Sequence, residues 1–201
     1  TLDTYAAASR ALNDVDEVVM YEVNISCPNV HAGGLVFGTD CAAAQEVCRA
    51  VKSETDKPVI MKLSPNVTDI VSIAKACEEA GADGLSLINT LMGMSIDVNK
   101  QKPVLGNVTG GLSGAAIRPV GVRMVYQVAQ AVSIPILGMG GICNWRDAIE
   151  YMLAGAQMVS VGAANFANPM APLEVLEGIE KYCEEKGIED INDIVGKAWK
   201  E

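Results

Sequence analysis

Short apolar runs recur along the chain, and each is followed by glycine or polar residues. Runs of this length, rich in Val and Ile, are typical of strands buried on both faces of a parallel sheet. Between the runs, apolar residues recur at spacings of three and four, as from Ile70 to Cys77 and from Met124 to Val132, which predicts amphipathic helices. The alternation of strand and helix predicts an α/β fold. The predicted strands are 18–25, 59–63, 84–89, 135–138 and 158–161.

Further helices are predicted near both ends of the chain. One covers 2–12, and two follow the last strand, at about 172–185 and 190–199. Thr68 and Asp69 offer an N-cap and a first-turn carboxylate to the helix that begins near Ile70. Helices in these places would complete the strand–helix alternation.

Two segments of the chain repeat the same order of signals. Lys57-Pro58-Val59-Ile60 leads through a helix to Ala80-Gly81-Ala82-Asp83, and Ile134-Pro135-Ile136-Leu137 leads through a helix to Ala154-Gly155-Ala156-Gln157. The copies lie 77 residues apart at the prolines and 74 apart at the glycines. A proline that opens a strand and a glycine that ends a helix, twice in the same order, indicate a duplicated βαβα unit.

Duplicated βαβα units build (β/α)8 TIM barrels, so we predict such a barrel, with residues 1–201 as a single domain that holds about five strands. A complete barrel needs about 250 residues, and we therefore expect roughly three βα units before Thr1. The alternative is a complete five-stranded doubly wound sheet, which suits the strand count and the length.

Composition and charge narrow the function classes. The 201 residues are 50% apolar, and 25 acidic against 15 basic side chains give a net charge of -10. This sign disfavours nucleic-acid partners and anionic membrane surfaces. Six cysteines without a C-x-x-C pair, and a single histidine, give no zinc pattern. We expect reduced cysteines in a cytoplasmic protein, with Cys41, Cys48, Cys77, Cys143 and Cys183 as ordinary small hydrophobic residues.

The strand ends carry the candidate chemistry, because active sites of parallel α/β folds lie at the carboxyl ends of the strands. The first strand ends in Asn24-Ile25-Ser26-Cys27-Pro28-Asn29. The two amides can recognise a cyclic imide, and a thiol between them can act as base or nucleophile if its pKa is lowered. A small core cysteine is the alternative, but Pro28 and the nearby glycines favour a loop.

The remaining strand ends suggest an anionic, phosphorylated ligand. Lys62, near the end of an apolar strand, must reach solvent or meet a negative partner such as an anionic cofactor ring. The last two strands end in Gly138-Met139-Gly140-Gly141 and Gly162-Ala163-Ala164-Asn165, and glycine loops at these positions of a barrel bind phosphate through backbone N–H groups. The loop 110–114 could add further donors, and Asn89 and Thr90 close the third strand.

Taken in order from about residue 17 to 180, these motifs resemble the dihydroorotate dehydrogenases. The cysteine of the Asn-x-Ser-Cys-Pro-Asn loop resembles the class 1 enzymes. The segments 89–94 and 109–114 are most similar to class 1B, in which an FMN-bearing catalytic subunit pairs with an iron-sulfur and FAD subunit that passes electrons to NAD.

This resemblance implies a role for each candidate residue. Cys27 would be the general base that removes a proton from C5 of dihydroorotate while the C6 hydride goes to FMN. The substrate would be held by Asn24, Asn29, Asn89 and Thr90. A homodimer and a partner with FAD and a 2Fe-2S cluster are also implied. From the negative charge we expect no membrane or nucleic-acid contact. The FMN-binding residues would be Asn24, Lys62, Ile88, Gly114, Gly140, Gly141, Gly162 and Ala163.

Two alternatives stay open at the level of sequence. One is a flavin barrel like that of dihydropyrimidine dehydrogenase, although no cysteine cluster follows here. The other is a non-catalytic barrel remnant, since family members carry about another third of the barrel before the position of Thr1. We expect the 201-residue chain alone to be inactive or weakly active.

Overall fold

A parallel sheet forms the centre of the molecule. The computed structural model describes residues 1–26 and 34–200. In this part of the chain the main sheet has five strands, in the order β1-β2-β3-β8-β9. All five predicted strands are therefore confirmed, to within a few residues at their ends. They are β1 (Tyr21–Asn24), β2 (Val59–Lys62), β3 (Gly84–Leu87), β8 (Ile136–Met139) and β9 (Met158–Ser160).

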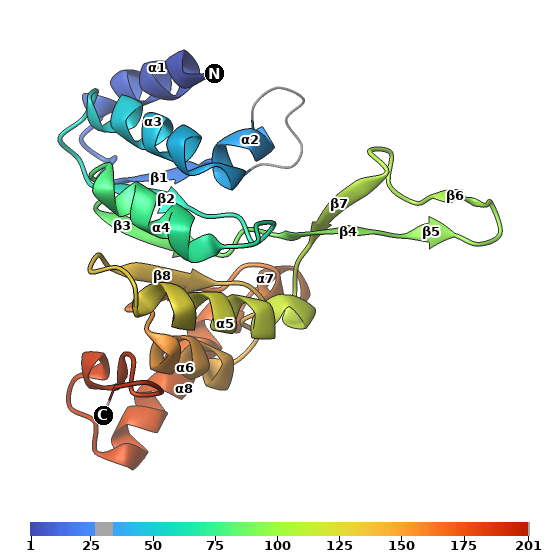
Figure 1. Ribbon diagram of the computed structural model, residues 1–201. Helices are drawn as coiled ribbons and strands as arrows, with labels where there is room; N and C mark the ends of the chain where they lie inside the picture. The colour runs from blue at the N-terminus through green and yellow to red at the C-terminus, as the bar shows by residue number, and fades with distance from the viewer. Residues whose placement is uncertain (27–33, 201) are drawn as a thin grey trace.

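The helices cover one face of this sheet (Figure 1). Each major helix packs against the next in chain order, as consecutive helices around a barrel do. A doubly wound sheet would reverse its strand order and carry helices on both faces. The doubly wound alternative is therefore wrong. The helices are α1 (Leu2–Asn13), α3 (Cys41–Lys52), α4 (Ile70–Glu79), α5 (Arg118–Ala129), α6 (Trp145–Ala154) and α8 (Ala171–Lys186).

Side-chain caps fix where several helices begin. The predicted cap of α4, Thr68, is wrong by one residue, because the helix begins at Ile70 and Asp69 is its N-cap. The Oδ1 of Asp69 accepts from the backbone N–H groups of Val71 and Ser72 at 3.0 and 3.2 Å. Asn144 caps α6 in a reciprocal box with Asp147. These caps satisfy N–H groups that have no partner within the helix.

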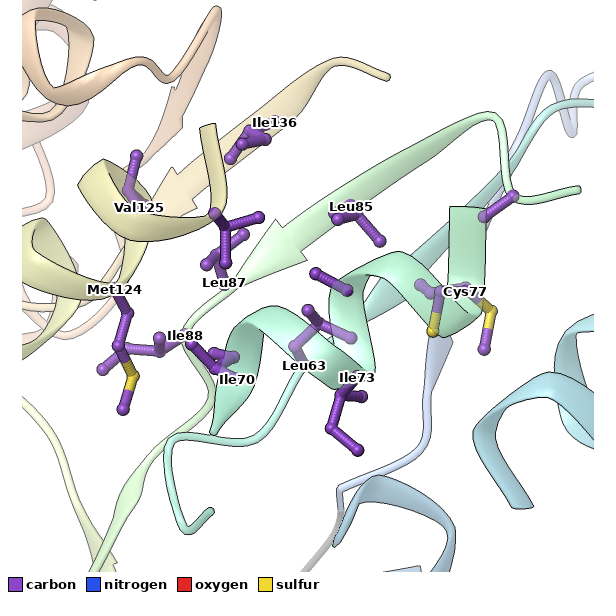
Figure 2. Packing of buried hydrophobic residues seen from close by; sticks show 14 of the residues in the cluster. Leu63, Ile70, Ile73, Cys77, Leu85, Leu87, Ile88, Met124, Val125 and Ile136 are labelled. Atoms are coloured by element: carbon purple, nitrogen blue, oxygen red, sulfur yellow. The ribbon is translucent and has the colours of Figure 1, made fainter. Parts of the chain in front are cut away.

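Alternate strand residues divide between the two faces of the sheet. One set, including Leu85, Leu87 and Ile136, is almost fully buried and packs against the helices (Figure 2). Helix residues such as Ile73 and Val125 complete this core. Because side chains alternate along a strand, the other set, which includes Lys62, faces the concave side of the sheet.

An antiparallel arm between β3 and α5 is the largest element that the periodicity missed (Figure 1). Loop 110–114 was expected as a source of backbone donors, but Gly110 and Gly111 lie within a strand of this arm and pair with β4. These two glycines therefore belong to a strand, and donation to a ligand from this segment stays a prediction. The arm consists of β4 (Leu91–Met94), β5 (Ile96–Asp97), β6 (Lys102–Pro103) and β7 (Thr109–Leu112).

Short elements fill the remaining connections. Residues 190–199, predicted as a helix, form only the 3-10 helix η2 (Ile191–Ile194) followed by turns, because Gly196 has a φ of +77°. The others are α2 (Gly34–Thr39), the 3-10 helix η1 (Ala115–Ile117) and α7 (Ala164–Ala167). Within residues 1–26 and 34–200, none of the helices has the length and apolar content needed to cross a bilayer.

The described cysteines differ in their surroundings. Cys48 and Cys77 are buried as predicted, and burial raises the pKa of their thiols to about 11 and about 12. Cys143, for which the sequence predicted an ordinary small hydrophobic residue, is exposed. It lies in the turn between β8 and α6, and its thiol donates to the carbonyl of Gly141 at 3.5 Å.

Candidate functional site

A cavity of about 360 Å³ lies at the carboxyl ends of the central strands. Its wall is built from the segments that follow β3, β7, β8 and β9, together with side chains of β1 and β2. This is the edge where the sequence predicts a ligand. The lining residues are Glu22, Lys62, Ile88, Asn89, Thr90, Ser113, Gly114, Ile117, Met139, Gly140, Gly141, Ser160, Gly162, Ala163 and Phe166.

Most of the predicted ligand-binding residues meet in this cavity. Of the predicted FMN-binding set, every member except Asn24 lines it, and so do Asn89 and Thr90 from the predicted substrate set. Asn24 lies beside the cavity and is joined to Asn89 by a hydrogen bond of 3.1 Å. Cys27 and Asn29 lie outside the described residues. Separate strand ends therefore converge on one site.

Two glycine turns present backbone donors to the cavity. Gly140 and Gly141 follow β8 with φ of +119° and +76°, which residues with a Cβ adopt only with strain. Within the described parts of the chain, the N–H groups of Gly140, Gly141, Gly162 and Ala163 donate to no acceptor. Unpaired N–H groups on adjacent loops form a concave site for an anion.

Open space at two glycines completes this cradle. A Cβ built on Gly114 or on Gly162 would meet no heavy atom within 4 Å. Both residues line the cavity, so a ligand could approach their backbone closely. The donors and the space together fit a phosphorylated ring compound such as FMN.

Tyr151 on α6 supports the first glycine turn from below. Its hydroxyl donates to the carbonyls of Met139 and Gly140 at 3.1 and 2.8 Å. Burial raises the pKa of Tyr151, and the nearby Glu150 carboxylate raises it further. The hydroxyl therefore stays a donor at any physiological pH. Gly121 and Gly138 leave room for the ring, since a Cβ on either would collide with it.

An ionic network ties the same turn to the beginning of two helices. Arg118, at the start of α5, forms an ion pair with Asp147 of α6, which is 4% exposed. Asp147 also accepts from the backbone N–H groups of Cys143 and Asn144 at 2.9 and 3.2 Å. The turn that carries Gly141 is thus held at both ends.

An amide cluster lies at the end of β1. Asn24 Oδ1 accepts from Asn89 Nδ2 at 3.1 Å and from the Ser26 hydroxyl at 3.2 Å. Asn89 Oδ1 in turn accepts from the backbone N–H of Thr90 at 2.7 Å. These bonds fix the orientation of both amides and, among the described residues, leave the Asn24 amino group without an acceptor. Asn24 can therefore donate to a carbonyl or carboxylate of a ligand.

Lys62 meets a protein carboxylate at the cavity. Its Nζ lies 3.1 Å from Glu22 Oε2 on the neighbouring strand. The side chains are 21% and 37% exposed, so the pair is partly shielded from water. Among the lining residues that the structure describes, these two are the ionisable ones.

Comparison with known proteins identifies the family. The sequence model of the dihydroorotate dehydrogenase family matches residues 1–183. The chain belongs to the dihydroorotate dehydrogenase family. It is similar to proteins named "dihydroorotate dehydrogenase B (NAD(+)), catalytic subunit". The identity is 60% over 198 residues in Desulforamulus reducens, 55% over 199 in Brachyspira hyodysenteriae and 58% over 197 in Alkaliphilus oremlandii.

These matches cover 98% of this chain but only 65%, 66% and 65% of those three relatives. The chain therefore spans about two thirds of the length of the dihydroorotate dehydrogenases that it matches. The described strand order is that of consecutive strands in a TIM barrel, in agreement with the predicted class.

Several residues of the cavity were not singled out from the sequence. Glu22 lies in a strand with an alternating pattern, and this alternation could have indicated that it shares a face with Asn24. Tyr151 appears in the sequence only as one more apolar position of a helix. Phe166 lines the cavity and is 96% exposed, which no local pattern reveals.

Proposed function

We propose that the protein oxidises dihydroorotate to orotate in pyrimidine biosynthesis, with FMN as the hydride acceptor. The observation that carries the proposal is the cavity, where two glycine turns with unpaired N–H groups meet Lys62 and the amide cluster of Asn24 and Asn89. The names of the similar proteins, which cover this chain almost completely, support the same activity.

The cavity residues divide into two groups around the cofactor. FMN supplies a two-electron acceptor for hydride when it is bound. The N–H groups of Gly140, Gly141, Gly162 and Ala163 would donate to its phosphate. Ile88, which is 2% exposed, and Gly114 would contact the flavin ring. The Lys62 ammonium would lie at the pyrimidine edge, where it favours the reduced anion.

The amide cluster and the residues that follow it in the sequence would bind the substrate. Asn24, Asn29, Asn89 and Thr90 would hold the pyrimidine and its carboxylate, with Asn24 as a donor because its acceptor oxygen is already engaged. Cys27 would remove the proton from C5 as the hydride leaves C6, so that a C5–C6 double bond forms. An ordinary thiol has a pKa of about 8.5, so surrounding donors must favour the thiolate.

Electrons would leave through a second protein. The relatives are named as catalytic subunits of NAD(+)-linked enzymes, which supports a partner that carries FAD and a 2Fe-2S cluster. A homodimer of the catalytic subunit and a cytoplasmic location remain predictions. Co-purification of the subunit with its partner, followed by dihydroorotate-dependent NAD reduction, tests this part of the proposal.

The central experiment is a visible spectrum of the full-length protein. We expect uptake of FMN in equal amount to the protein, and bleaching of the flavin when dihydroorotate is added without air. Failure to bind FMN would contradict the proposal. So would bleaching by dihydrouracil but not by dihydroorotate, because that would point to a different pyrimidine substrate.

A pair of glycine variants tests whether the described cavity is the FMN site. Gly162→Val puts a side chain into open space at the cavity, so the fold is retained and FMN should bind roughly tenfold more weakly or not at all. Gly106 lies in the arm and also has open space around a Cβ, and Gly106→Val is the control that keeps normal FMN binding. Equal FMN affinity in the two variants would place the flavin elsewhere.

A further inference from the structure

The ion pair between Glu22 and Lys62 is a built feature of the cavity wall. Glu22 is paired in register with Ile60, and Lys62 with Asn24, so the two charged residues are diagonal neighbours on adjacent strands. Both side chains point to the same face, and the lysine reaches the carboxylate at 3.1 Å. The sheet register therefore brings this carboxylate to this lysine.

The carboxylate changes what Lys62 presents to a ligand. A lysine side chain has four rotatable bonds, and a fixed acceptor restricts where its ammonium group lies. The carboxylate also offsets the positive charge, so the pair is close to neutral as a whole. A ligand that gains negative charge beside this wall would meet the oriented Lys62 ammonium group, whose positive charge is partly offset by Glu22.

We propose that Glu22 is a positioning residue that acts through Lys62 to limit how strongly the site favours reduced over oxidised flavin. The inference rests on the FMN binding proposed above and deepens it. Because side chains alternate along β1, Glu22 faces the cavity, and from there it would adjust the reduction potential of the flavin through Lys62.

A second ion pair in the same molecule serves as a matched control. Lys52 and Asp83 lie 2.8 Å apart, with side chains 29% and 42% exposed, close to the values for Lys62 and Glu22. Asp83 precedes β3, at the amino end of the strands, whereas the cavity lies at their carboxyl end. Loss of this pair perturbs the sheet without altering charge at the cavity.

The experiment measures the two-electron midpoint potential of FMN bound to the full-length protein. Glu22→Gln keeps the size and a hydrogen-bond acceptor but removes the negative charge. We expect it to favour reduced FMN by about tenfold, which for a two-electron couple raises the potential by about 30 mV. Asp83→Asn should leave the potential at the wild-type value, and Lys62→Met should lower it.

The double variant Glu22→Gln/Lys62→Met separates action through the lysine from a direct effect on the flavin. If Glu22 works through Lys62, the glutamine substitution shifts the potential less in the methionine background than in the wild type. An equal shift in both backgrounds overturns the proposal, as does an unchanged potential in Glu22→Gln.

Two further outcomes also decide against it. An equal rise in Asp83→Asn would show that general loosening of the sheet, and not charge at the cavity, sets the potential. A wild-type protein that binds no FMN would overturn the proposed function itself, and the inference with it. A flavin-loaded wild type with an unresponsive Glu22→Gln variant leaves the proposed function standing and removes only the role of Glu22.

Discussion

The two copies of the internal repeat are alike at one end and different at the other. At the amino ends of the strands, Asp83 accepts from the N–H of Val59 at 2.7 Å, and Gln157 accepts from the N–H of Ile136 at 2.9 Å. Gly81 and Gly155 end their helices with φ of +93° and +126°. The same hydrogen bonds and turns thus build both units.

At the carboxyl ends of the strands, the two copies carry different functional groups. The first copy ends β2 with Lys62, and β3 leads to the amide of Asn89. The second copy ends both strands in glycine turns that present backbone N–H groups. The first copy supplies charge and side-chain amides and the second supplies close backbone approach, as expected for a barrel whose stability and function lie at opposite ends.

Substitution of the helix-ending glycines should give the largest difference between the copies. Gly155→Ala adds a Cβ that collides with Ala129 at a strained φ, so we expect a loss of about 2–4 kcal/mol in the free energy of unfolding. Gly81→Ala meets open space and costs about 1–2 kcal/mol of strain alone. Urea unfolding measures both. Equal losses would mean that the second copy relaxes around the new methyl group.

The next largest effect is expected from substitution of Tyr151, which hydrogen-bonds to the glycine turn after β8. Tyr151→Phe leaves the carbonyls of Met139 and Gly140 without their donor, which we expect to cost about 1–2 kcal/mol of stability. The loss should be accompanied by weaker FMN binding, because the turn is no longer held. The equivalent position in the first copy is Cys77, and Cys77→Ala should destabilise the protein without changing FMN affinity. Unchanged FMN binding in Tyr151→Phe would show that the turn keeps its shape without the hydroxyl.

Local sequence signals were sufficient for the strands and for the glycine turns. An apolar run followed by Gly-x-Gly-Gly indicates the end of a strand from local sequence alone. Gly140 and Gly141 could therefore be assigned to a turn after a strand. The repeat predicted a barrel, in which consecutive parallel strands are neighbours, and the strand order in the structure agrees with it.

Contacts between segments that are distant in the sequence could not be predicted from these local signals. The Glu22–Lys62 pair depends on the register between two strands that are about forty positions apart. The sequence of either strand alone does not determine this register. The arm from Leu91 to Leu112 was missed because its strands are short and half exposed, so no buried period marks them. The roles of Cys27 and Asn29 remain predictions, since these residues lie outside the described part of the chain.

The residues that accept at the amino ends of the strands should differ in pH dependence. Burial opposes ionisation of Asp83, but donation by Lys52 and by the Val59 N–H outweighs it and holds the pKa of Asp83 below its ordinary value. A lowered native pKa adds stability above the unfolded pKa, and this is lost as pH falls through the native one. Asp83→Asn should therefore flatten the fall in stability from about pH 5 to pH 3. Gln157→Ala should cost about 1 kcal/mol at every pH. Parallel pH profiles for the wild type and Asp83→Asn would contradict this.

The smallest effects should come from two serines at equivalent positions of the repeat. Ser86 on β3 is fully buried, and among the described residues its hydroxyl is the buried side-chain oxygen or nitrogen without a partner. Ser86→Ala removes an unsatisfied polar group, so we expect a change within about 1 kcal/mol, in the stabilising direction. Ser160 on β9 lines the cavity, and Ser160→Ala should leave stability unchanged and alter only FMN affinity. A clear loss of stability in Ser86→Ala would show that the hydroxyl has a partner in solution, which would most simply be a water on the concave face beside Lys62.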